Sequence, residues 1–185
     1  MSESLRSTER LPTTADNAYK RLLQRLELSS TWDGAIDAVA PVAGRLIAAA
    51  PARRFFHGDA TGVPLHGILT DVPLGAWFLA QFLDLFRDDG SRRAATRLMT
   101  LGVASAVPTA VAGWAEWAGA DHATRRVGLT HASLTGLATL VFASSCAARL
   151  RGHHGAGVAL ARLGNVPVIA GAFMGGHLGS RRRLG

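Results

Sequence analysis

The residues best suited to chemistry are histidines and carboxylates that lie near the ends of four separated apolar stretches. Neutral imidazole donates an electron pair to haem iron or to a divalent metal, and carboxylates bind metals or relay protons. The candidate ligands are His66, His131 and His177, and the polar residues expected to support them are Thr70, Asp71, Glu116 and Trp117. No catalytic residue is assigned, because no phosphate-binding, dinucleotide-binding, zinc-protease or nucleophile-elbow pattern occurs.

The four apolar stretches predict transmembrane helices at about 67–86, 94–119, 128–148 and 158–178, since a helix crosses a bilayer with about 20 apolar residues. Their short loops favour an up-down-up-down four-helix bundle over residues 57–185. Residues 15–56 form an amphipathic helical region, and residues 1–14 are expected to be a disordered tail. The chain is therefore predicted to be all-α and integral to a membrane. The alternative is a soluble bundle of unusually apolar helices, which the helix lengths and flanking arginines disfavour.

The first apolar stretch carries a polar stripe that explains why a bundle is needed. On a helix its members follow steps of three and four residues. They are His66, Thr70, Pro73, Trp77, Gln81 and Asp84. A membrane helix must turn such a stripe toward other helices or toward water.

Topology brings the candidate residues together. In the predicted bundle, the starts of the first and third helices and the ends of the second and fourth share one membrane face. These four places hold all the candidate ligands and supporting residues, with Asp121 and His122 in the loop beside them. The opposite end carries Asp84, loop arginines, His153 and His154, and is expected to be an ordinary solvated rim.

The clustered residues have two interpretations. In the first, the three histidines bind haem b, shape a quinone site, or hold a divalent metal with Asp71 or Glu116. In the second, the same residues form a structural polar lock, because buried carboxylates in lipid are stable only when paired. The lock would make the protein a non-catalytic membrane scaffold or interaction module.

Charge and composition limit the partners. The net charge is +7 and the isoelectric point is near 11.3, but the arginines lie between and outside the apolar stretches, as in membrane proteins. We therefore expect the lipid bilayer, and no nucleic acid, as a partner. The polar N-terminal region lacks a secretory signal, which favours the cell inner membrane with cytoplasmic termini. The basic-aromatic run at 53–56 fits either a membrane surface or packing on the end of the bundle.

Taken in order, the candidate residues resemble the bacterial four-helix membrane family catalogued as domain of unknown function 2231. The resemblance runs from about Phe56 to Arg183. Its family pattern is a Gly-His-Pro-x-His-Pro entry, an acidic-Pro-x-Gly-x-Trp helix, a Gly-x-x-Asp-Trp helix end, a His-x-x-x-Asn helix start and a terminal Gly-Gly-His-Leu. The matching residues are Gly62, Pro64, His66, Thr70, Asp71, Pro73, Gly75, Trp77, Asp84, Gly113, Glu116, Trp117, Arg125, Arg126, His131, Gly175, Gly176, His177 and Leu178.

Four positions depart from that pattern. Val63 replaces the first histidine and Gly67 the second proline, so a site that needs the first histidine would be lost. Glu116 replaces an aspartate, and Thr135 an asparagine. Because some members of this family are fused to a Rieske-type iron–sulfur domain, the resemblance implies a Rieske-type or other electron carrier as a partner.

Overall fold

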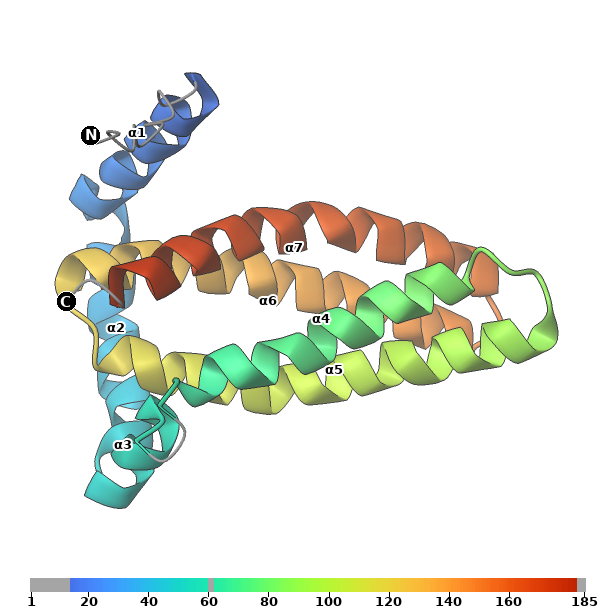
Figure 1. Cartoon of the computed structure of the whole chain (residues 1–185), viewed down its shortest axis with the longest axis horizontal. Coiled ribbons are helices and arrows are strands. Elements are labelled where there is room, and N and C mark those ends of the chain that lie inside the picture. The colour runs from blue at the N-terminus through green and yellow to red at the C-terminus, as the bar shows by residue number, and fades with distance from the viewer. Residues whose placement is uncertain (1–13, 60–61, 183–185) are drawn as a thin grey trace, which may run out of the picture.

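The computed structural model describes residues 14–59 and 62–182, and these residues are mostly helical, without a strand (Figure 1). The all-α prediction is therefore confirmed for this part of the chain. The elements are α1 (Thr14–Leu28), η1 (Ser30–Trp32), α2 (Asp33–Gly44), η2 (Arg45–Ile47), α3 (Ala50–His57), α4 (Leu65–Leu83), α5 (Asp89–Ala118), α6 (His122–Leu150) and α7 (His154–Arg182). The predicted disordered tail lies outside the described residues, except for Thr14, which begins α1.

All four long helices begin earlier than the sequence suggests, α5 and α6 by the most. The Asp88 carboxylate accepts hydrogen bonds from the Ser91 amide at 2.9 Å and its hydroxyl at 2.6 Å, so α5 starts at Asp89 rather than near residue 94. Asp121 caps α6 in the same way through Thr124. An aspartate before a helix satisfies amides that have no partner within the helix. These loop carboxylates are therefore helix caps.

The long helices form two antiparallel hairpins, α4 with α5 and α6 with α7, which share the most extensive contacts (Figure 1). In the first hairpin, His66 lies against Gly113 and Trp77 against Gly102. The two contacts occur in opposite order along the two helices, so α4 and α5 are antiparallel. The glycines matter here because a Cβ at Gly102 would lie 2.3 Å from the indole nitrogen of Trp77.

The second hairpin repeats the spacing of the first. His131 lies against Gly175 and Phe142 against Gly164. In each hairpin the aromatic residue lies eleven positions after the histidine. The glycine that contacts the aromatic ring lies eleven positions before the glycine that contacts the histidine. In both hairpins this histidine also starts the sequence His-x-x-Leu-Thr. The two hairpins are therefore an internal structural repeat.

Equivalent positions of this repeat meet where the hairpins pack together. The His66 and His131 rings are 6.3 Å apart, and the Asp84 carboxylate pairs with the Arg149 guanidinium. Between these two contacts, the equivalent rings of Trp77 and Phe142 stack on each other. They belong to a buried core that includes Ala80, Met99 and Ala161. Contacts at both ends show that α4 and α6 run in the same direction. The arrangement is that of two hairpins related by an approximate twofold axis along the helices.

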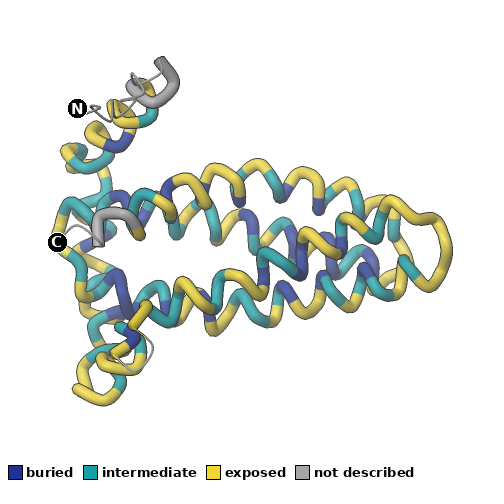
Figure 2. The backbone as a smooth tube through the Cα atoms, viewed as in Figure 1, coloured by how far each residue is buried: buried dark blue, intermediate teal, exposed yellow. Residues whose placement is uncertain are grey.

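Hydropathy and burial are those of a membrane protein. Buried positions line the seams between helices, and exposed positions lie on the outer surfaces (Figure 2). The exposed residues include many large apolar ones. Within the described residues, α5, α6 and α7 are long and apolar enough to cross a membrane. A fourth candidate is the pair Ser30–Ile47 and Ala50–His57, bent by 99°. The predicted first spanning helix, α4, has 19 residues and is not among these candidates, because polar residues lower its hydropathy.

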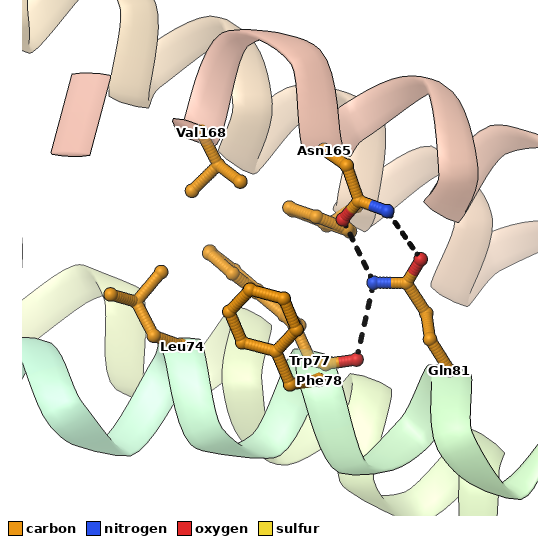
Figure 3. Close-up of a pocket in the computed structure, with 7 residues that line it drawn as sticks. Leu74, Trp77, Phe78, Gln81, Asn165 and Val168 are labelled. Atoms are coloured by element: carbon orange, nitrogen blue, oxygen red, sulfur yellow. Dashed lines mark hydrogen bonds between the residues drawn. The ribbon is translucent and has the colours of Figure 1, made fainter. Parts of the chain in front are cut away.

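The polar stripe predicted on α4 faces neighbouring helices. None of its six residues is exposed, and Pro73 and Trp77 are buried. Gln81 forms a reciprocal pair of amide hydrogen bonds with Asn165 of α7, at 3.0 and 2.8 Å (Figure 3). The amide pair satisfies two polar side chains within an otherwise apolar seam that includes Val168.

The N-terminal helices pack across the end of the bundle where α4 and α6 begin (Figure 1). Ile36 and Ala43 of α2 form a buried cluster with Trp117 and Leu129. In a second cluster, Leu23 of α1 packs with apolar residues of α6 and α7. This arrangement agrees with packing on the bundle's end, whereas the basic-aromatic run of α3 keeps three exposed side chains, Arg53, Arg54 and Phe55.

Candidate functional site

His66, the second residue of α4, is held by groups on two helices. Its Nδ1 lies 2.9 Å from the backbone carbonyl oxygen of Thr109 on α5. A carbonyl only accepts hydrogen bonds, so Nδ1 carries a proton, and in the neutral imidazole Nε2 keeps its lone pair. The edge of the ring lies against Gly113, and the Thr70 hydroxyl donates to the His66 carbonyl at 2.7 Å.

His131 has the same surroundings in the second hairpin. Its Nδ1 donates to the Gly171 carbonyl of α7 at 2.8 Å, and its ring lies against Gly175. The Thr135 hydroxyl, four residues later, donates to the His131 carbonyl at 2.9 Å. Thr135, which stands where the resembling family has asparagine, thus corresponds to Thr70 of the first hairpin.

The two imidazoles form a pair with defined tautomers. Their ring centroids are 6.3 Å apart and their planes are inclined by 89°. In the part of the chain that the structure describes, neither Nε2 atom has a hydrogen-bond partner. An imidazole whose N–H is held by a carbonyl is the usual form of a histidine that ligates a metal or haem. The pair therefore presents two oriented electron-pair donors.

The third candidate ligand lies elsewhere. His177 Nε2 is 3.2 Å from the Glu27 carboxylate of α1, so this histidine links α7 to the N-terminal region. Asp71 is exposed on α4, with no ion-pair partner among the described residues. Within those residues, no group of three or more histidine, cysteine or acidic side chains could hold a metal ion. The structure thus brings together two of the three candidate ligands.

Glu116 and Trp117 are buried in the last turn of α5. The Trp117 indole N–H donates to the Arg125 carbonyl at 2.9 Å, and the Arg125 guanidinium carbon lies 5.4 Å from the centre of the same ring system. Arg125 also donates to the Ala118 carbonyl at 2.6 Å. These contacts close the turn between α5 and α6 beneath α2.

Sequence reasoning missed the ion pair that holds α2 in place. Arg126 of α6 binds Asp33 through two hydrogen bonds of 2.8 and 2.7 Å and also donates to the Glu27 carbonyl. The Arg126 guanidinium holds the pKa of Asp33 below its ordinary value, and His122 at 3.9 Å adds to this effect. Asp33 had only the local pattern of a helix cap, and no sequence signal linked it to Arg126.

At the opposite end, the expectation of an ordinary solvated rim is wrong for Asp84. Its side chain is 2% exposed and forms a two-bond ion pair with Arg149, which is fully buried, at 2.7 and 2.5 Å. Arg149 also donates to the Ser145 hydroxyl at 3.2 Å, and His154 lies 3.3 Å from Asp84. The repeat contained a signal for this pair, because each residue follows its hairpin histidine by eighteen positions.

Comparison with known proteins agrees with the apolar helices and adds no function. The sequence profile of a family described as "Predicted membrane protein (DUF2231)" matches residues 62–185, which include both hairpins. Neither a curated protein nor a solved structure matches the chain. Because the profile covers more than half of the sequence, the chain belongs to the DUF2231 family of predicted membrane proteins.

Proposed function

We propose that this membrane protein is a redox-associated module in which His66 and His131 are the imidazole ligands of a b-type haem. The pair of Nδ1-anchored rings, 6.3 Å apart, carries the proposal. His66 and His131 would supply the two imidazole nitrogens that hold the group, and the haem iron would supply one-electron chemistry. The donor chemistry of the two neutral imidazoles fits this group.

The protein's contribution would be to position these ligands. The Thr109 and Gly171 carbonyls fix the tautomers and strengthen both Nε2 donors, while the glycines beneath the rings let the helices approach closely. A haem with two imidazole ligands accepts and returns single electrons. Glu116, buried one turn after Gly113, would adjust the local field.

The proposal includes a membrane arrangement. α4 is packed along α5 and, at 1.5 Å per residue, is about 28 Å long, close to the roughly 30 Å of a hydrocarbon core. We infer that it crosses as a fourth helix in the inner membrane, with α1–α3 and the end of α7 on the cytoplasmic side. Labelling of single cysteines at Ser30 and Ser91 in intact cells tests this orientation. Ready labelling of Ser30→Cys by an impermeant reagent would show that α1–α3 lie outside the cytoplasm, which is the opposite orientation.

A Rieske-type or other electron carrier completes the redox proposal, as the family resemblance implies. The test mixes reduced haem-loaded protein with an oxidised Rieske-type protein and follows the haem absorption. Loss of the reduced band on mixing would support such a partner, whereas no transfer would remove it from the proposal.

The alternative function is a non-catalytic scaffold that presents the N-terminal helices at the membrane surface. The Asp33–Arg126 ion pair and the Glu27–His177 contact favour it, because both tie α1 and α2 to the bundle. In that case the His66 and His131 rings only fill the space that their neighbouring glycines leave between the helices. The structural polar lock then needs no cofactor.

A reduced-minus-oxidised absorption spectrum separates these functions. Detergent-purified protein from haem-supplemented cells should show a Soret shift and an α-band, which His66→Ala and His131→Ala each abolish. His153→Ala, at the exposed opposite end, should leave both intact. A flat spectrum for well-folded wild-type protein would overturn haem binding, whatever the variants do, and favour the scaffold.

A further inference from the structure

An open cavity of about 360 Å³ lies at the end of the bundle opposite the histidine pair. It is formed by the first turns of α5 and by the turn between α6 and α7. Four arginines, Arg92, Arg93, Arg97 and Arg149, line it, together with Thr96, Gly152 and His154. The cavity is separate from the proposed haem ligands, so it requires its own explanation.

Positive charge in this cavity exceeds the negative charge that balances it. Arg149 is neutralised by Asp84, and Arg92 has a loose contact of 3.8 Å with Asp89. Arg93 and Arg97 have no carboxylate within ion-pair distance in the described part of the chain. Residues four apart share one helix face, so their guanidinium groups repel each other unless an anion lies between them.

The floor of the cavity is held in place by buried groups. Arg149 is fixed by Asp84 and by the Ser145 hydroxyl, which itself donates to the Gly157 carbonyl at 2.6 Å. Gly152, with a φ of +84°, makes the tight turn that returns the chain into α7. The fixed floor means that the exposed arginines of α5 face a site of constant shape.

The cavity also lies where headgroups would be. It is at the start of α5, the end of α6 and the start of α7, which are the three helices apolar enough to cross a membrane. Arginine binds phosphate oxygens with two parallel hydrogen bonds, and anionic phospholipid headgroups carry such oxygens. We propose that Arg93 and Arg97 bind a phosphate group here, either in an anionic phospholipid headgroup or as free phosphate.

The test is ligand-induced thermal stabilisation of the full chain in detergent. Short-chain phosphatidylglycerol and inorganic phosphate are titrated separately, with zwitterionic phosphatidylcholine as the reference. A ligand that binds only the folded state raises the midpoint of thermal unfolding, and at a given concentration the rise is larger for a tighter ligand. Phosphatidylglycerol should stabilise the wild type, and Arg93→Gln/Arg97→Gln should weaken its binding on the order of thirtyfold.

Arg53→Gln/Arg54→Gln is the matched control, because it removes two exposed charges from the opposite end. It should bind phosphatidylglycerol as the wild type does. Equal binding of inorganic phosphate, lost in Arg93→Gln/Arg97→Gln, would identify a free-phosphate site; binding of the lipid alone would identify the headgroup. Equal weakening in both double variants, or no stabilisation of the wild type by either ligand, would overturn the proposal.

Discussion

The Trp77 indole stacks on the Phe142 ring, with centroids 4.2 Å apart and planes inclined by 19°. The two side chains occupy equivalent places in the two hairpins, and each lies against a glycine of the helix that pairs with its own, Gly102 and Gly164. The same pattern holds for the paired histidines and their glycines. One spacing therefore sets the close approach of the helices and the position of the candidate ligands.

Gly102→Ala should destabilise the protein. The added methyl group would lie 2.3 Å from the Trp77 Nε1, and the stacked ring has little room to move. Overpacking of this kind costs about 1–3 kcal/mol. Thermal unfolding in detergent measures the loss. Gly136→Ala, in α6 with nothing within 4 Å of the added atom, should be neutral or slightly stabilising, and equal stability of the two variants would contradict the packing argument.

Asp84→Asn should destabilise the protein by about 3–5 kcal/mol, because it leaves the buried Arg149 guanidinium without a counter-charge. The double variant Asp84→Leu/Arg149→Met removes both charges and should recover a large part of that loss. Unfolding in a denaturing detergent compares the three proteins. A double variant as unstable as Asp84→Asn would mean that the pair itself, rather than the orphaned charge, stabilises this end.

The sequence predicts the helices and the polar stripe of α4 well, because length, apolar content and residue spacing are local signals. It places His66 and His131 at one end for the same reason. It does not predict that His177 pairs with Glu27, since contacts between the N-terminal helices and the bundle join residues far apart in the chain. A charged residue beside a turn has the same local sequence whether its side chain is solvated or buried. The sequence therefore wrongly predicts that the Asp84 side chain is solvated.

Docking of α1 and α2 on the bundle should weaken as the pH falls below about 4. The pKa of Asp33 is lowered by Arg126 from its ordinary 3.8, so the stability that this carboxylate contributes is present above 3.8 and is lost as the pH falls through the lower, folded-state value. Hydrogen exchange of the α1–α2 amides, corrected for intrinsic rates, measures docking between about pH 6 and pH 3.

Asp33→Asn should dock more weakly at neutral pH and show a smaller pH dependence. Asp37→Asn, on the exposed face of the same helix, is the control and should follow the wild type. Wild-type-like exchange in Asp33→Asn would show that apolar packing alone holds α2.

Gly175→Ala should disturb His131, whereas Gly176→Ala should not. A Cβ at Gly175 would lie 3.1 Å from the ring Cε1 and 3.5 Å from Nδ1, pressing the ring away from the Gly171 carbonyl. A weakened hydrogen bond costs about 0.5–1.5 kcal/mol, so thermal unfolding detects the change without any cofactor. At Gly176 nothing lies within 4 Å. If the histidines hold haem, Gly175→Ala should also shift or weaken the α-band while Gly176→Ala keeps it. Equal effects of the two variants on both measurements would mean that the His131 ring does not depend on its contact with Gly175.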